Sequence, residues 1–374
     1  MSHDSPDNTE QPAAEPRVLA PRKKWLFRLV AVGIPTTIGI VVLVVMMIRY
    51  RFLVVEPETM RPVIQRPFYL QEPGYETTGH RYLFDAKLGW RNIPNWQATT
   101  HGKSLTINSR GLRDRDYPFK KPADVTRILV LGDSFTWGYG VADDEIFTEV
   151  LETRLAESAA EYEVINSGVS GWGTDQEYLF LVNEGFRYAP DIVVLAFFLL
   201  NDPVENVSSR VYEMNKPMFL DDQLTLANVP VPKPHVHPGL HRRGDEIAIT
   251  LAIMKAMSQE CKQHGATLVV MKFGRFLLPS SPILLGDEQV IEEEIGTWPD
   301  TLYFDLDREF EAEGLSVERL TSGNSDGHWN AFGHQATAEM LYEFLFQSRV
   351  LENLSITTQS IPEPTILDLR ETSP

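Results

Sequence analysis

The stretch "RILVLGDSFTWGYGV", from Arg127 to Val141, decides the fold class of this chain. After its leading arginine, an unbroken apolar run is typical of a strand that is buried on both faces of a parallel sheet. The run stops at Gly132, Asp133 and Ser134, and the residues after them favour a helix. A buried strand that turns directly into a helix predicts an α/β fold. In such folds, ligands bind beyond the carboxyl ends of the strands.

The same strand-then-helix pattern repeats along the rest of the chain. The predicted strands are 127–132, 162–166, 191–198, 266–273 and 302–306. The predicted helices are 145–159, 174–186, 246–264, 287–295 and 331–347. Continuous apolar strands that alternate with helices indicate a mostly parallel sheet covered by helices on both faces.

Composition limits the functional class. The chain has 374 residues, 43% of them hydrophobic, which is enough to bury a sizeable core. The formal net charge of -18 argues against a nucleic-acid partner, because phosphate recognition requires clustered Lys and Arg. The single cysteine, Cys261, excludes an internal disulfide and a cysteine-based metal site.

An apolar segment near the N-terminus predicts a membrane anchor. Residues Leu29 to Ile48 carry no charge, and as a helix they would span about 30 Å, the thickness of a hydrocarbon core. A cleaved signal peptide usually has a shorter apolar region, followed by small residues, whereas Arg49 and Arg51 follow here. Basic residues before the span mildly favour a cytoplasmic N-terminus. We therefore expect a retained single-pass anchor, with the bulk of the chain outside the cytoplasm.

Composition also divides the chain into segments. The main folded domain is predicted at 76–350, with a Pro-rich insertion at 207–245. The remaining segments are a disordered cytoplasmic tail at 1–25, the transmembrane anchor at 26–49, a Pro-containing stalk at 50–75 and a flexible tail at 351–374.

Ser134 has two interpretations when it is considered alone. Either Asp133 or Ser134 caps the next helix, or Ser134 is a nucleophile at the electropositive start of that helix. A serine nucleophile requires a general base, a group that orients the base, and donors for the oxyanion. The loop "SDGHWNAFGH" offers Asp326 and His328. "LLND" ends the third strand with Asn201, and a glycine in "NSGVSGWGT" (166–174) offers a backbone N–H, although each is also an ordinary turn residue.

Together these segments resemble the SGNH (GDSL-type) hydrolase family. "GDSFTWG", "VINSGVSGWGT", "LLND" and "DGHWNAFGH" stand in the order of four of the family's sequence blocks, and the resemblance covers about residues 125–348. It implies a flavodoxin-like three-layer sandwich with about five parallel strands. It also implies that Ser134 is the nucleophile and that His328, rather than His334, is the base.

The resemblance assigns the oxyanion donors as well. It implies that three groups donate hydrogen bonds to the oxyanion. They are the backbone N–H of Ser134, the backbone N–H of Gly171 rather than Gly168, and the side-chain amide of Asn201. One departure concerns the orienting acid. Asp326 precedes His328 by two residues, whereas the family's usual pattern has three. A shorter loop must still bring the carboxylate to the ring, or the site is a Ser–His pair with a weakened orienting group.

The resulting expectation is a membrane-anchored serine esterase that hydrolyses O-acyl esters, acetyl foremost, on an acylated carbohydrate or another small ester. Its chemistry requires no metal and no organic cofactor. An O-acyltransferase with the same site, or a non-catalytic glycan-binding domain, remains an alternative. Trp137, Trp172 and Trp329 each neighbour a motif, and they either stack on sugars or pack in the core.

Overall fold

The structure is a computed structural model. It describes Thr36, Ile40 and residues 53–55, 62–64, 82–100, 102–158, 160–212, 214–232, 245–278, 282–321 and 327–351. The chain divides into two compact units, Met1–Phe68 and Tyr69–Pro374.

In the first unit, the described residues form one antiparallel pair inside the predicted stalk. Strand β1 (Leu53–Val55) pairs with β2 (Pro62–Ile64). No helix among the described residues is both long and apolar enough to cross a membrane. Apart from Thr36 and Ile40, which are helical, the predicted span Leu29–Ile48 lies outside the described residues, so the anchor remains a prediction.

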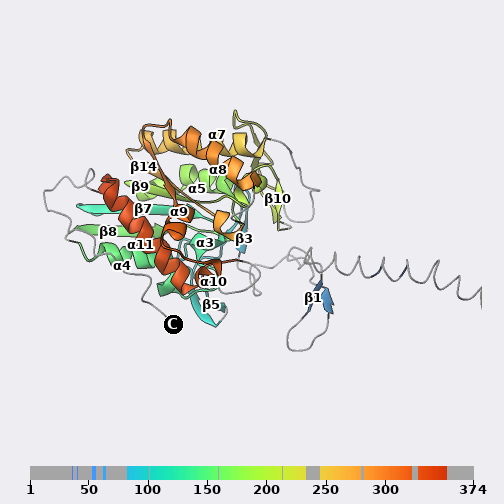
Figure 1. The fold of residues 1–374 in the computed structure, drawn as a ribbon, viewed down its shortest axis with the longest axis horizontal. Helices are drawn as coiled ribbons and strands as arrows, with labels where there is room; N and C mark the ends of the chain where they lie inside the picture. The colour runs from blue at the N-terminus through green and yellow to red at the C-terminus, as the bar shows by residue number, and fades with distance from the viewer. Residues whose placement is uncertain are drawn as a thin grey trace, which may run out of the picture. The chain divides into compact units, whose positions relative to one another are not determined.

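The second unit is built on a parallel sheet of five strands (Figure 1). Its strands, in chain order, are β7 (Val125–Gly132), β8 (Glu161–Asn166), β9 (Ile192–Phe198), β14 (Thr267–Phe273) and β15 (Thr301–Asp305). Their order across the sheet is β15-β14-β9-β7-β8, and every neighbouring pair is parallel. This is the flavodoxin-like order, with the switch point between β7 and β9. The predicted α/β fold with five parallel strands is confirmed.

Helices cover both faces of this sheet. The longer ones are α4 (Phe147–Leu155), α5 (Thr174–Asn183), α7 (Glu246–Gln263), α8 (Pro282–Ile295) and α11 (Ala331–Gln347). The shorter ones are α3 (Ser134–Trp137), α6 (Asp202–Glu205), α9 (Leu306–Ala312) and α10 (Val317–Leu320). Three 3-10 turns, η3 (Asp143–Glu145), η4 (Gly185–Tyr188) and η5 (Arg275–Leu277), join these elements.

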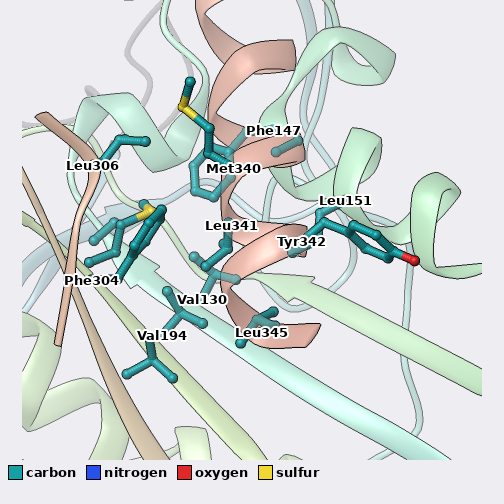
Figure 2. Close-up of a cluster of buried hydrophobic side chains, with 14 of the residues drawn as sticks. Val130, Phe147, Leu151, Val194, Phe304, Leu306, Met340, Leu341, Tyr342 and Leu345 are labelled. Carbon is teal, nitrogen blue, oxygen red and sulfur yellow. The ribbon is translucent and has the colours of Figure 1, made fainter. Parts of the chain in front are cut away.

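The main apolar core lies between the sheet and the helices α4 and α11. Figure 2 shows the side chains of this core, which come from the sheet, from α4 and from α11: Val130, Val194, Phe147, Leu151, Leu341 and Leu345. The alternate strand residues Leu129, Val193 and Val270 point to the opposite face and are equally buried, toward α5 and α7. Burial on both faces explains why the strands are continuous apolar runs in the sequence.

Short strand pairs lie outside the parallel sheet. Before it lie the pairs β3 (Tyr82–Asp85) with β4 (Gly89–Asn92), and β5 (Gln97–Thr100) with β6 (Lys103–Thr106). The described part of the insertion forms the pairs β10 (Arg210–Val211) with β11 (Met214–Asn215), and β12 (Met218–Phe219) with β13 (Leu226–Ala227). Gly89 has a φ of +86°, and a Cβ there would lie 2.4 Å from the Asn215 carbonyl oxygen. Glycine therefore allows β4 and β11 to touch.

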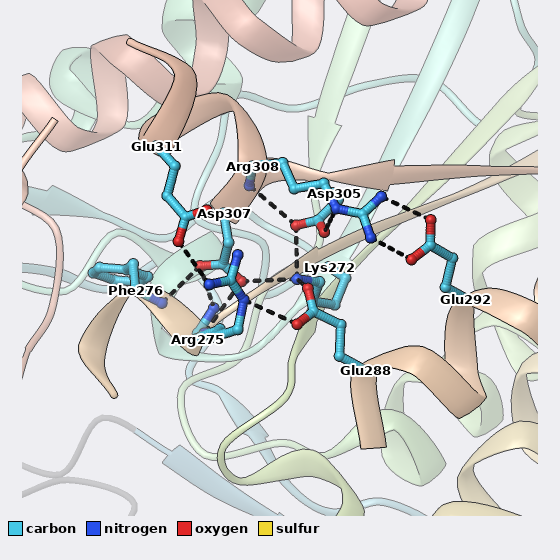
Figure 3. Close-up of polar contacts among 10 residues, drawn as sticks. Lys272, Arg275, Phe276, Glu288, Glu292, Asp305, Asp307, Arg308 and Glu311 are labelled. Atoms are coloured by element: carbon cyan, nitrogen blue, oxygen red, sulfur yellow. Dashed lines mark hydrogen bonds and ion pairs between the residues drawn. The ribbon is translucent and has the colours of Figure 1, made fainter. Parts of the chain in front are cut away.

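A buried ion-pair cluster joins the carboxyl ends of β14 and β15 (Figure 3). The Lys272 ammonium lies 2.6 Å from Asp305 and 3.0 Å from Asp307, and it also contacts Glu288. These three carboxylates have the spacing of a cation site, and the ammonium of Lys272 fills that position. Asp307 also accepts hydrogen bonds from the backbone N–H groups at the start of η5: those of Gly274, Arg275 and Phe276.

The cluster has a structural consequence for the loop that carries His328. Because Asp307 fixes η5, it also fixes Leu277 at the end of that turn. A Cβ on Gly327 would lie 3.0 Å from Leu277 Cδ1, so the two segments are in close contact. The ion-pair cluster therefore supports the backbone directly before His328.

Candidate active site

Ser134 lies directly after β7, as the first residue of α3. The two roles that the sequence left open fall to different residues. The Asp133 carboxylate caps the helix, accepting a hydrogen bond of 2.9 Å from the backbone N–H of Phe135. The Ser134 hydroxyl is consequently not the cap, and Ser134 is only partly buried.

The imidazole of His328 meets the Ser134 hydroxyl. The distance from His328 Nε2 to Ser134 Oγ is 2.7 Å, although the two residues are 194 positions apart in the sequence. Two aromatic rings flank the imidazole, with centroid distances of 4.9 Å to Phe135 and 4.6 Å to Tyr139. The prediction that this hydroxyl and this imidazole converge in one place is confirmed, and the contact has the geometry of a nucleophile and its base.

The residues after His328 hold it in position. Trp329 is buried in the core, and its ring packs edge-on against that of Phe135 at 4.8 Å. Asn330 caps α11 by accepting a bond of 2.9 Å from the Gly333 N–H, and its amide donates to the carbonyls of Arg319 and Thr321. This role of Asn330 was not predicted from the sequence. An asparagine just before a helical pattern is the N-cap signal that could have indicated one.

The other two candidates near His328 are Asp326 and His334, and the structure describes only His334. Asp326 lies in 322–326, outside the described residues, so its role as orienting acid remains a prediction. His334 is buried and accepts a hydrogen bond of 3.2 Å from the backbone N–H of Phe147 at its Nδ1. Burial, with smaller effects from Arg113 and His328, lowers the pKa of His334 to about 3. His334 is therefore a neutral structural residue, and His328 is the histidine at Ser134.

The predicted oxyanion donors Ser134, Gly171 and Asn201 lie after the carboxyl ends of β7, β8 and β9. Gly171 has a φ of +82°, a left-handed conformation that favours glycine. Among the hydrogen bonds of the described residues, none uses the backbone N–H of Ser134 or of Gly171. The N–H of Gly168, by contrast, donates to the Asn166 side chain at 2.9 Å. The Asn201 amide nitrogen lies 3.4 Å from the Asp133 carboxylate, next to Ser134.

The three tryptophans near the motifs are packing residues. Trp137, Trp172 and Trp329 are at most 1% exposed. The indole N–H of Trp172 donates to the Trp90 carbonyl at 2.9 Å, and that of Trp137 to the Asn92 side chain at 3.1 Å. None of the three presents a face to a sugar, which decides the alternative that the sequence left open.

A group of buried carboxyl groups lies behind this site: Asp133, Asp175, Glu177, Asp202 and Glu205. Desolvation by burial raises the pKa of Asp133 to about 6 and that of Glu205 to about 8. Burial and the neighbouring acids also raise the pKa values of Glu177 and Asp202 well above their ordinary range. The ammonium of Lys216 pairs with Asp175 and contacts the Glu205 carbonyl at 3.0 Å. The sequence showed no sign of this group, since acidic residues at helix starts usually face solvent.

We expect Glu205→Gln to stabilise the protein increasingly as the pH rises from 5 to 8. The folded state holds the Glu205 proton up to about pH 8, whereas the unfolded chain releases it near the ordinary pKa of glutamate. The stability contributed by the protonated group is complete below that ordinary value and is lost as the pH rises toward 8. Glutamine cannot ionise, so the variant escapes this loss, by up to about 1.4 kcal/mol per pH unit.

Thermal unfolding at pH 5, 6, 7 and 8 measures this difference. Glu161→Gln, at an exposed position on β8, is the matched control and should change the Tm equally at every pH. A Tm difference between Glu205→Gln and the parent that stays constant from pH 5 to 8 would contradict the prediction.

Ser134 follows a buried parallel strand and begins a helix, and the His328 imidazole lies within hydrogen-bond reach of its hydroxyl. This arrangement defines an α/β serine hydrolase. The sequence pattern of the GDSL-like Lipase/Acylhydrolase family matches residues 130–336, more than half of the chain. The chain therefore belongs to this family and is an enzyme that hydrolyses ester bonds.

Several solved structures are similar to this chain. TesA is 16% identical, with a TM-score of 0.41 over 59% of this chain and 98% of its own. A catalytic mutant of Axe2, an acetylxylan esterase from Geobacillus stearothermophilus, is 14% identical, with a TM-score of 0.39 over 59% and 93%. The lipase/acylhydrolase from Enterococcus faecalis is 17% identical, with a TM-score of 0.40 over 60% and 96%. No curated protein sequence matches the chain. At this level, the similarities say nothing about its substrate.

Proposed function

We propose that this enzyme is a membrane-anchored serine esterase that removes O-acyl groups, acetyl foremost, from polysaccharide outside the cytoplasm. The observation that carries the proposal is the 2.7 Å contact between Ser134 Oγ and His328 Nε2. A nucleophile within hydrogen-bond reach of its base is the minimum geometry for acyl transfer through a covalent intermediate.

The proposed reaction has two halves. His328 Nε2 takes the hydroxyl proton while Ser134 Oγ attacks the ester carbonyl carbon, which forms a tetrahedral oxyanion. As that intermediate collapses, the alcohol leaves with the proton from His328, and the acyl group stays on Ser134. Water, deprotonated by His328, then releases the carboxylic acid and restores the hydroxyl. In this proposal Asp326 orients the imidazole and stabilises its charged form.

Three donors stabilise the oxyanion in this scheme. They are the backbone N–H groups of Ser134 and Gly171 and the amide of Asn201. The two backbone groups form no other hydrogen bond among the described residues, which supports their availability. Removing one donor from a site of this kind costs about 3–4 kcal/mol of transition-state stabilisation.

Two features support the choice of substrate. The described part of the insertion, up to residue 232, contains short strand pairs and lacks the apolar helical lid expected over a lipid-ester site. The uncharged segment Leu29–Ile48 favours an anchor that holds the enzyme at a membrane surface. A polymer outside the cytoplasm is a substrate that such an enzyme reaches without entering the bilayer.

We expect carbonate-washed membranes that carry the full-length protein to release acetate from acetylated polysaccharide. On p-nitrophenyl esters of increasing chain length, kcat/KM should be highest for acetate and fall toward decanoate. A preference that rises with chain length would contradict the polysaccharide assignment. Activity that is lost from the membranes in the wash would contradict the anchor. Transfer of the acyl group to an added sugar, in place of acetate release, would identify an O-acyltransferase and contradict the hydrolase.

A further inference from the structure

Tyr139 directly follows Gly138, the residue that ends α3, the short helix that begins with Ser134. Its backbone N–H donates a hydrogen bond of 3.0 Å to the Ser134 carbonyl, which turns the chain back toward the nucleophile. The guanidinium of Arg113 is buried and fixes this turn, because it donates to the carbonyls of Gly138 and, at 2.9 Å, Trp137. One short segment therefore sets the positions of both Ser134 and Tyr139.

The side chain of Tyr139 contacts a small apolar cluster as well as the imidazole of His328. The cluster consists of the buried side chains of Leu105, Ile107 and Trp137, and Tyr139 packs against it. Leu105 belongs to β6, so part of this support comes from a hairpin that precedes the residues matching the family pattern. The β5–β6 hairpin thus supports a ring that lies against the proposed base.

Two aromatic rings lie close to the imidazole of His328. The Tyr139 and His328 centroids are 4.6 Å apart, with 39° between the ring planes. The Phe135 and His328 centroids are 4.9 Å apart, with 29° between the planes. Both distances lie in the range of offset-stacked rings. Phe135 also belongs to the main apolar core, whereas Tyr139 is only partly buried, so Tyr139 can be changed with less disturbance of the fold.

The charge of the imidazole changes during the proposed reaction. His328 is neutral before it acts as a base, and it is positively charged once it holds the proton taken from Ser134 or from water. The face of an aromatic ring is electronegative and attracts a cation within about 6 Å of its centroid. The neighbouring rings therefore stabilise the charged imidazole more than the neutral one. An interaction that strengthens on the way to the transition state raises kcat.

We propose that Tyr139 is a positioning residue of the active site, whose ring holds the His328 imidazole and stabilises its protonated form. The inference rests on the proposed function, which makes His328 the general base. Tyr139 acts through His328 and forms no bond with the ester. Its contribution should accordingly be seen in kcat more than in KM.

Two substitutions separate the ring from the hydroxyl. On p-nitrophenyl acetate, Tyr139→Leu should lower kcat about tenfold and leave KM within about twofold, the scale of one cation–π contact that is partly shielded from water. Tyr139→Phe keeps the ring, so its kcat should stay within about twofold of the parent's. Tyr178→Leu is the matched control, since Tyr178 is a partly buried tyrosine on α5 beside Phe219, and its kcat should be unchanged.

Fluorinated rings separate the stabilisation of charge from packing. Pentafluorophenylalanine in place of Tyr139 has nearly the shape of phenylalanine, but its fluorines withdraw electron density and reverse the charge over the ring face. It should lower kcat about tenfold relative to Tyr139→Phe at a similar Tm, with difluorophenylalanine between the two. A ring that acted only by packing would give the same kcat in all three proteins.

Several results would overturn the inference. They are an equal kcat for the phenylalanine and pentafluorophenylalanine proteins, a Tyr139→Leu protein with the parent's kcat, or a raised KM with an unchanged kcat, which would show that the ring binds substrate instead. The fluorinated series decides the question even if Tyr139→Leu does not fold. Ser134→Ala is measured in parallel. If it is inactive while the Tyr139 variants are fully active, only the inference fails. If Ser134→Ala is itself active, the proposed function fails.

Discussion

Ser134→Ala should abolish ester hydrolysis, lowering kcat by at least about 10⁴-fold. Without the hydroxyl, no acyl-enzyme can form, and His328 has no nucleophile to deprotonate. Residual turnover would come only from water oriented by the oxyanion donors. The fold should be unaffected, because Ser134 is partly exposed and Asp133, rather than Ser134, caps α3.

Initial rates on p-nitrophenyl acetate and a thermal melt check this prediction together. Ser158→Ala is the control, since Ser158 is a partly buried serine whose hydroxyl donates to the Ala160 carbonyl at 3.3 Å. It should retain the parent's kcat. A Ser134→Ala protein that melts normally and turns over within tenfold of the parent would show that another group is the nucleophile.

Lys272→Met should reduce stability by about 3–5 kcal/mol, because Asp307 is then buried without its cation. Glu288 and Asp305 keep their ion pairs with Arg275 and Arg308. The side chains of Lys272 and Asp307 are inaccessible to solvent, and those of Asp305 and Glu288 are nearly so. Methionine has a similar length and no charge, so the change removes the ammonium without opening a large cavity. Denaturant unfolding, with the slope m compared between variants, measures the loss.

Lys262→Met is the matched control for this substitution. Lys262 forms an ion pair of 2.6 Å with Asp300, but its side chain is 66% exposed. Exposed pairs contribute at most about 1 kcal/mol, so this variant should stay within that range. If Lys272→Met lowers the free energy of unfolding by less than about 1 kcal/mol, the ion pairs of Lys272 do not stabilise the fold. That result would contradict the account of the cluster as a set of buried ion pairs.

The five strands of the parallel sheet were predictable to within two residues because each is a continuous apolar run buried on both faces. The ends of the helices were predicted less accurately. Helix α8 begins at Pro282, whereas the pattern predicted a start at 287, because Gly286 and Pro282 are breaker signals in a sequence. Proline is tolerated in a first helical turn, and Gly286 has open space around it, so neither residue ends the helix.

The part of the site that lies in short sequence motifs was predictable. Ser134, His328 and Asn201 stand in short blocks whose order in the chain indicated that they converge. The Lys272 cluster and the buried carboxyl groups near Lys216 were not predictable, because their partners come from distant elements that meet only in the folded sheet.

Fluorophosphonate labelling of the full-length protein, followed by peptide mass spectrometry, tests most directly whether Ser134 is a nucleophile activated by His328. The account predicts one modified residue, Ser134, in the parent protein, and labelling that is lost in His328→Ala. Folded, ester-hydrolysing protein that leaves Ser134 unmodified, or that is labelled equally well without the His328 imidazole, would contradict it.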